Sequence, residues 1–358
     1  MQRFTVPLLL LCGYGLLVGL AHANVITLYW QSVIMFVGIN VILATSLNLI
    51  NGNMGEFSCG HAGFMAVGAY VSSLVTVALI GQHPVLGAPV LGPAWSLAVF
   101  PLALLVGGAA AAVTGLIVAF PSFKTRGDYL AIITIAALYI VKSTIENLDV
   151  IGGARGFMGM SQVTKAMDKT INLPWILIWV FVFATLTIWT LRRFITSTYG
   201  QGVNAISQDE IAAEIMSVNT NKMKTVAFML SSGLAGVAGG LFAHVLGYVN
   251  PGSFTIMKST EIMVMVYLGG MGSISGVVIA AVLFTLLMES LRFVFPMITD
   301  TLHWLHLLPQ SYQVTQVWKW VLIPLMLFLL MHKRPEGLMG NRELSDIFPR
   351  LKKFYSFK

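Results

Sequence analysis

The residues best suited to chemistry form a polar stretch between two strongly apolar segments, at about 196–224. Acidic and small residues stand side by side in it: Asp209, Glu210, Ala212, Ala213 and Glu214. Glu210 and Glu214 share one helix face at i,i+4, a like-charge pairing that costs an isolated helix a few tenths of a kcal/mol. The small residues would let another protein approach closely. This pattern predicts a short helix that docks on a partner outside the bilayer.

Motifs that mark common enzymes are missing from the sequence. It contains no G-x-x-x-x-G-K-[ST], no G-x-S-x-G and no H-E-x-x-H. Its two cysteines, Cys12 and Cys59, have no Cys or His neighbour at metal-ligand spacing. We therefore expect a non-enzymatic chain that holds no metal and no cofactor of its own, and whose energy source lies elsewhere.

The composition requires a membrane. Of the 358 residues, 57% are hydrophobic and only 10% are charged, and the mean hydropathy is +0.82. Soluble proteins carry about 25% charged residues, so no soluble fold could bury this apolar surface. The net charge of +7 is expected to set membrane orientation rather than to bind nucleic acid, because the basic residues cluster at the ends of apolar segments.

Ten apolar windows could form membrane helices, each of which needs about 20 residues to cross. They lie near 4–22, 25–50, 57–81, 95–120, 128–146, 173–194, 224–249, 259–270, 276–295 and 317–331. The eighth and tenth are short, and the eighth is a candidate re-entrant segment. The predicted fold is all-α and polytopic, with about 8–10 transmembrane helices and glycine-broken or re-entrant segments.

The predicted boundaries give one membrane domain, residues 1–340, and a basic cytoplasmic tail, residues 341–358. The N-terminus also resembles a signal peptide, because Ala21-His22-Ala23 follows a basic start and an apolar run. We favour an uncleaved helix, since another apolar segment follows almost at once. With ten crossings and the N-terminus inside, most of the 21 Lys and Arg residues face the cytoplasm. Both termini and the 196–224 stretch are then cytoplasmic.

Two glycine-rich segments share the pattern G-x-M-G-x-[FI]-S, at 52–58 and 269–275. Glycine-interrupted apolar segments at matching positions of two halves point to a substrate pathway. The pattern is short, so both an internal duplication and a chance match remain open. The residues assigned to this pathway or hinge are Gly52, Gly55, Ser58, Gly60, His61, Tyr139, Glu261, Gly269, Gly270 and Gly272. His61 is expected to be a hydrogen-bonded packing residue rather than a proton shuttle, and Glu261 could equally be a helix cap.

Several motifs resemble those of a known transporter family. Asp209-Glu210-x-Ala212-Ala213-x-x-x-Ser217 is similar to the E-A-A-x-x-x-G signature of ABC importer permeases, with Ser217 in place of glycine. This departure is tolerable if the turn does not need a positive φ. Further stretches, at 48–70, 125–132, 152–156, 224–239, 261–273 and 333–338, resemble branched-chain amino acid ABC permeases of the LivM type.

The resemblance implies a permease that works with a second homologous permease, two cytoplasmic ATPases that bind ATP and Mg, and an external solute-binding protein. The docking residues would be Gln208, Asp209, Glu210, Ala212, Ala213, Glu214 and Ser217. The family's usual substrates are leucine, isoleucine and valine, and close relatives carry urea or short amides. Tyr139 stands where many members have an acidic residue, which leaves the substrate open. The resemblance also implies residence in the bacterial inner membrane, in contact with lipid. An ion-coupled secondary transporter is the alternative from another class.

Overall fold

The computed structural model describes residues 5–23, 25–82, 87–123, 129–304, 315–334, 336–340 and 342–347. Residues 125–128 of the motif at 125–132, and residues 348–358 of the predicted tail, lie outside these ranges.

Each of the ten apolar windows contains one helix, as the hydropathy of the sequence predicts. These helices are α1 (Thr5–His22), α2 (Leu28–Asn48), α3 (His61–Ile80), α4 (Ser96–Ser122), α5 (Tyr129–Glu146), α7 (Trp175–Ile195), α10 (Thr220–Leu246), α11 (Ile256–Gly269), α12 (Ile274–Trp304) and α13 (Lys319–Lys333). Shorter helices are η2 (Leu49–Asn53), η3 (Pro93–Trp95), η4 (Asp149–Ile151), η5 (Gly153–Arg155), α6 (Met160–Thr170), α8 (Thr198–Gln208), α9 (Glu210–Ile215), η6 (Pro251–Ser253), η7 (Gln316–Trp318) and α14 (Leu344–Ile347).

The described residues contain fewer helices of spanning length than there are apolar windows. Among the described residues, seven helices are long and apolar enough to cross a membrane: α2 to α5, α7, α10 and α12. Helix α11 has 14 residues and is therefore about 21 Å long, which is less than the hydrocarbon core of about 30 Å. The prediction of an all-α polytopic membrane protein is confirmed, and so is the expectation that the eighth window is short.

Helix α10 lies at the centre of the bundle and packs on α3 and α4 through small residues. A Cβ atom at Gly68 of α3 would clash with the backbone of Gly236, and one at Gly239 would clash with the backbone of Met65. Because glycine has no Cβ atom, the backbones of these helices can approach closely. Close approach at small residues is how membrane helices associate without a hydrophobic driving force. The glycines give the bundle a rigid centre.

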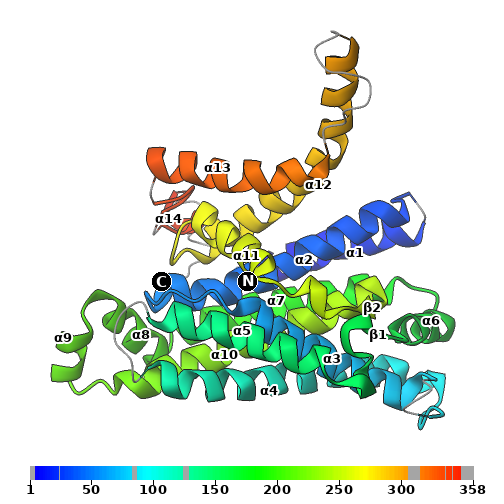
Figure 1. Cartoon of the computed structure of the whole chain (residues 1–358), viewed down its shortest axis with the longest axis horizontal. Coiled ribbons are helices and arrows are strands. Elements are labelled where there is room, and N and C mark those ends of the chain that lie inside the picture. Colours follow the sequence, from blue (N-terminus) through cyan, green and yellow to red (C-terminus); the bar gives the residue numbers. More distant parts are fainter. Residues whose placement is uncertain are drawn as a thin grey trace.

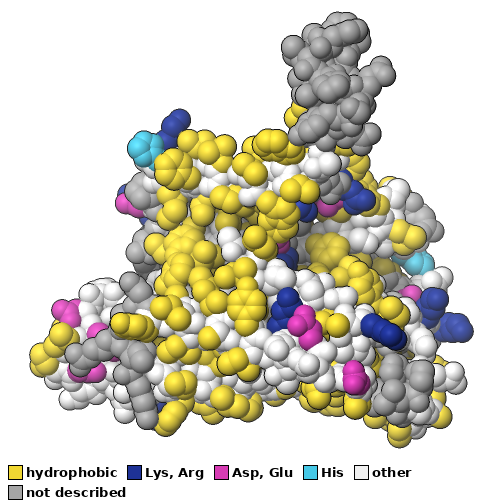
Figure 2. All heavy atoms as spheres, in the orientation of Figure 1, with side chains coloured by type: hydrophobic (Ala, Val, Ile, Leu, Met, Phe, Trp, Pro, Cys, Tyr) yellow, Lys and Arg dark blue, Asp and Glu magenta, His cyan; other side chains and the backbone are white. Residues whose placement is uncertain are grey.

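The bundle has two polar ends on opposite sides (Figure 1). One end carries α8 and α9, and the other carries α6 and a small antiparallel sheet of β1 (Phe157–Met158) and β2 (Tyr248–Val249). Hydrophobic side chains cover most of the face between these ends, whereas acidic side chains gather over α9 (Figure 2). This distribution fits a protein whose middle contacts lipid.

Candidate functional site

The polar stretch at 196–224 folds as two short helices, α8 and α9, because its polar residues cap each new helix. Ser197 accepts a hydrogen bond from the Gly200 amide at the start of α8. Asp209 accepts one from the Ala212 amide at the start of α9, at 3.0 Å, and Asn219 caps α10 in the same way. Such caps satisfy amides that a helix leaves unpaired and stabilise its start by about 1 kcal/mol. They fix where α9 begins.

Helix α9 ends in a turn that needs a left-handed residue, and Ser217 supplies it with a φ of 63°. The Val218 amide donates to the Ala213 carbonyl at 3.0 Å, and the Ser217 amide donates to the Glu214 carbonyl at 2.9 Å. These are the two bonds of a Schellman turn, which normally has glycine at this position. The turn therefore does need a positive φ, and serine adopts it at a cost in strain.

The exposed surface of α9 is more apolar than the sequence motif suggests. Ile211, Ile215 and Met216 are 69%, 77% and 78% exposed. The predicted docking residues Gln208, Asp209, Glu210, Ala212, Glu214 and Ser217 are also exposed, whereas Ala213 is buried against the rest of the chain. Sequence reasoning missed the three large apolar side chains, although apolar residues in a polar loop were a visible signal. Exposed apolar patches are typical of sites that contact a protein or a membrane.

A buried lysine joins α9 to the rest of the domain. Lys224, on the first turns of α10, lies with its Nζ 2.7 Å from Glu56 Oε1 and 2.8 Å from Glu210 Oε1. Its side chain is only 7% exposed. Because Glu56 belongs to the first glycine-rich segment and Glu210 to α9, the lysine links these two elements. Sequence reasoning missed this ion triad, since Glu56 lies 168 positions before Lys224 in the chain.

Further contacts hold α8 against the first glycine-rich segment. Asn53 Nδ2 donates to Asn204 Oδ1 at 3.5 Å, and a Cβ atom at Gly55 would lie 3.2 Å from the Cβ atom of Ser207. Gly55 has a φ of +74°, a conformation that glycine adopts freely. The first glycine-rich segment therefore packs closely against α8.

The two glycine-rich segments meet in space, although 217 positions separate them in the sequence. The Gly272 amide donates to Asn48 Oδ1 at 3.0 Å, and a Cβ atom at Gly52 would clash with the same amide. Gly55 and Gly272, which occupy the same place in the shared pattern, both have positive φ, +74° and +84°. The shared pattern thus corresponds to one shared left-handed glycine, although Gly270 also has a positive φ and its counterpart Asn53 is helical.

The C-terminal segment packs on the second glycine-rich segment. The Leu338 amide donates to the Leu268 carbonyl at 2.9 Å. The buried carboxylate of Glu343 accepts hydrogen bonds from the amides of Ile274 and Ser275, at 2.8 and 3.1 Å, and from the Ser275 hydroxyl. It therefore caps the start of α12, where a negative charge is favourable. Gly269 and Gly270 lie at the same contact.

Buried polar atoms gather around the first glycine-rich segment. Those without a hydrogen-bond partner among the described residues are Asn48 Nδ2, Asn51 Nδ2, Asn53 Oδ1, Ser58 Oγ and His61 Nδ1. Such groups are costly to bury unless a solvent or solute molecule satisfies them. His61 Nε2 pairs with the Ser46 hydroxyl at 2.9 Å, and its ring is fully buried. This burial and this bond fit the expected packing histidine.

The remaining predicted pathway residues lie in different surroundings. Tyr139 on α5 is 48% exposed. Glu261 pairs with Lys258 at 3.0 Å, and it lies inside α11 rather than at its cap, because that helix begins at Ile256. Gly60 lets the chain approach the Thr134 carbonyl. Partial burial raises the pKa of the Cys59 thiol, which keeps this neighbour of the segment protonated and unreactive at neutral pH.

Comparisons with known proteins show the family of the chain. The model of the family "branched-chain amino acid transport system / permease component" matches residues 29–331. The high-affinity branched-chain amino acid transport system permease protein LivM of Escherichia coli (strain K12) is 30% identical over 281 residues, which cover 71% of this chain and 61% of that protein. The chain therefore matches about three fifths of the length of this relative.

More distant relatives cover other shares of the sequence. A probable branched-chain amino acid transport permease protein LivM of Methanocaldococcus jannaschii is 21% identical over 350 residues, covering 90% of this chain and 95% of that protein. The LivH permease protein of Salmonella typhimurium is 21% identical over 253 residues, covering 68% and 78%. No solved structure matches the chain. The predicted resemblance is confirmed, and the chain belongs to the family of branched-chain amino acid transport system permease components.

Proposed function

We propose that this chain is the membrane permease subunit of an ABC importer that translocates branched-chain amino acids or related small amino compounds. The names of its relatives, which describe branched-chain amino acid permeases, support the substrate class. The observation that carries the proposal is the ion triad of Lys224, Glu210 and Glu56, which ties the exposed helix α9 to a glycine-broken membrane segment.

In this proposal α8 and α9 dock on one of two cytoplasmic ATPases, which bind ATP and Mg. The exposed side chains of Ile211, Ile215 and Met216 would enter an apolar cleft on that partner. Complete burial of such a side chain contributes about 1.5–3 kcal/mol. The acidic residues Asp209, Glu210 and Glu214 would form the polar rim that sets orientation.

A movement of α9 would reach the first glycine-rich segment directly. The carboxylate of Glu210 would shift Lys224, and Lys224 would shift Glu56 through charge-assisted bonds of 2.7 and 2.8 Å. Because Gly52 and Gly55 carry no side chains and Gly55 is left-handed, the segment can change its backbone angles with little strain. Opening of the pathway is then coupled to closure of the ATPases.

The unpartnered polar atoms around this segment mark where the solute would pass. They include amide donors of Asn48 and Asn51 and the ring nitrogen of His61, which could satisfy the polar groups of an amino compound in transit. The passage would be completed by a second homologous permease, and an external solute-binding protein would deliver the ligand. The chain would lie in the bacterial inner membrane, with α9 and both termini in the cytoplasm.

The rival transport mode, ion coupling, has less support. It calls for ionisable carboxylates inside the spans, and none of the carboxylates in the described spans is fully buried. A permease for urea or short amides would use the same docking and differ only in the solute.

Copurification of the ATPase tests the docking claim. We expect Ile215→Asp, alone and with Ile211→Asp, to abolish assembly with the ATPase while the chain still reaches the membrane, because a buried carboxylate is costly. The matched control is Ile171→Asp, at another exposed isoleucine, before α7 at the opposite end of the bundle. Assembly and ATP-dependent uptake that persist in the Ile211 and Ile215 variants would refute the proposal. Uptake that survives ATP depletion but needs an ion gradient would favour the rival.

A further inference from the structure

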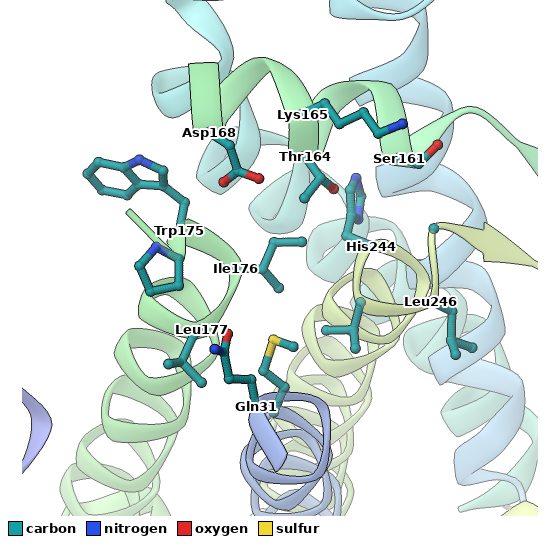
Figure 3. A pocket seen from close by; sticks show the side chains of 14 residues that line it. Gln31, Ser161, Thr164, Lys165, Asp168, Trp175, Ile176, Leu177, His244 and Leu246 are labelled. Atoms are coloured by element: carbon teal, nitrogen blue, oxygen red, sulfur yellow. The ribbon is translucent and has the colours of Figure 1, made fainter. Parts of the chain in front are cut away.

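A cavity of about 390 Å³ lies beneath α6, between the ends of α2, α7 and α10 (Figure 3). It is at the end of the bundle opposite α9 (Figure 1). Met35, Ile176 and Leu177 give it an apolar part. Pockets that bind small molecules have volumes of about 300–1,000 Å³, apolar walls and a few polar groups. The cavity therefore has the size and the walls of a ligand site.

Two opposite charges from α6 lie at this cavity without pairing to each other. Lys165 and Asp168 both line it, and in Figure 3 the lysine extends toward Ser161 while the carboxylate points to the side of Trp175. Among the described residues, neither has an ion-pair partner within 4.0 Å. Partial burial raises the pKa of the Asp168 carboxyl. Both residues are exposed to solvent, so a ligand that carries both charges can reach the cation and the carboxylate at this cavity.

Several other polar groups around the cavity are already bonded within the chain. Gln31 is buried, and its Nε2 donates to the carbonyls of Ile26 and Ala21, at 3.0 and 3.4 Å. This arrangement leaves Oε1 of the amide as an acceptor. Both ring nitrogens of His244 are already bonded, to Thr76 and to the Gly240 carbonyl. The indole of Trp175 donates to the Ile171 carbonyl, so its ring face is what it offers to a ligand.

We propose that this cavity binds a small zwitterion with a primary ammonium group, an acid group and an apolar portion. Lys165 binds the acid group, and Asp168 binds the ammonium group on the side of Trp175. The apolar portion lies against Met35, Ile176 and Leu177. A free apolar amino acid and the headgroup of phosphatidylethanolamine share this chemistry. The amino acid source rests on the proposed transport function, whereas the lipid source does not.

Binding to the purified full-length chain tests the proposal, with two probes. L-leucine is titrated against the chain in detergent, followed by Trp fluorescence and calorimetry. Phosphatidylethanolamine retention is measured by native mass spectrometry after exchange from nanodiscs, with phosphatidylglycerol as the comparison lipid. We expect Lys165→Met and Asp168→Asn each to weaken binding of the same probe at least about tenfold, since each removes a charge-assisted bond.

The matched control is Lys169→Met, which removes the same charge from the exposed face of α6 without touching the cavity. It should leave binding unchanged. Binding of L-leucine assigns the site to the transported solute, and selective retention of phosphatidylethanolamine assigns it to lipid; either supports the proposal. Binding of neither probe, or an equal loss in Lys169→Met, overturns it. Because the chain is measured without an ATPase, the result is independent of the docking at α9.

Discussion

Lys224→Met is the sharpest test of how α9 is attached to the membrane domain. Methionine keeps the length and the apolar stem of lysine but removes the ammonium group that contacts Glu56 and Glu210. The side chains of Glu56 and Glu210 are 23% and 46% exposed, so the substitution leaves one carboxylate largely buried and unpaired. Glu210 can instead be hydrated by solvent. The loss should therefore fall mainly on Glu56 and its segment.

The magnitude follows from these exposures. Removing one partner of a buried ion pair costs about 3–5 kcal/mol, whereas an exposed pair contributes about 0–1 kcal/mol. Because Glu56 lies between these limits, we expect Lys224→Met to destabilise the segment at 52–60 locally by about 2 kcal/mol. This corresponds to about thirtyfold faster amide exchange at that segment. Glu210→Gln should cost less than about 1 kcal/mol, since it removes only the more exposed contact.

Hydrogen exchange with mass spectrometry on the full-length chain provides the measurement. The double variant Lys224→Met with Glu56→Gln should recover much of the protection, because no buried charge is then left without a partner. An assembled importer that carries the Lys224→Met variant should still hydrolyse ATP but take up little solute. Two results would refute the reasoning. One is an equal loss of amide protection at 52–60 in Lys224→Met and Glu210→Gln, and the other is a double variant that loses as much protection as the two single variants together.

Four further outcomes are expected. Ser217→Gly should stabilise the end of α9 by about 1 kcal/mol and slow exchange of the Val218 amide, because it relieves a left-handed serine; unchanged exchange would contradict this. Glu343→Gln should increase exchange at the start of α12, with neighbouring helices unaffected, because it weakens a charged cap. Asn48→Leu should lower uptake more than ATP hydrolysis, because it removes the bond to Gly272; a parallel loss of both would argue against it. Cys59, in a Cys12→Ala background, should alkylate only as pH rises above the range of an ordinary thiol, since a raised pKa leaves less thiolate at each pH; a midpoint at or below that range would exclude the effect.

The helices could be predicted well because each membrane helix needs a long run of apolar residues. All ten windows contain a helix, and the short eighth window is the 14-residue α11. The caps of α8, α9 and α10 also have local signals, because Ser197, Asp209 and Asn219 each precede the helix that they start, although these caps were not among the predictions. Each of these features depends on residues within a few positions of one another, which is the range over which a sequence pattern is informative.

The parts that sequence reasoning missed depend on distant contacts. Glu56 and Lys224 lie 168 positions apart, and Asn48 and Gly272 lie 224 positions apart. No periodicity brings such pairs together, because they meet only through the packing of α10 on its neighbours and of α11 and α12 on α2. Ser217 is an intermediate case: its place in the motif was visible, but its φ depends on how the chain leaves α9.

The two glycine-rich segments share a left-handed glycine, Gly55 and Gly272, but they have different attachments. The segment at 52–58 is tied to α8 and α9 by Asn53 and by the triad through Glu56. The segment at 269–275 is tied to the C-terminal residues through Glu343. A force applied at α9 therefore reaches the first segment directly and the second through the bond from Gly272 to Asn48. In an importer, the first segment would move with the ATPase and the second would serve as the support against which it moves.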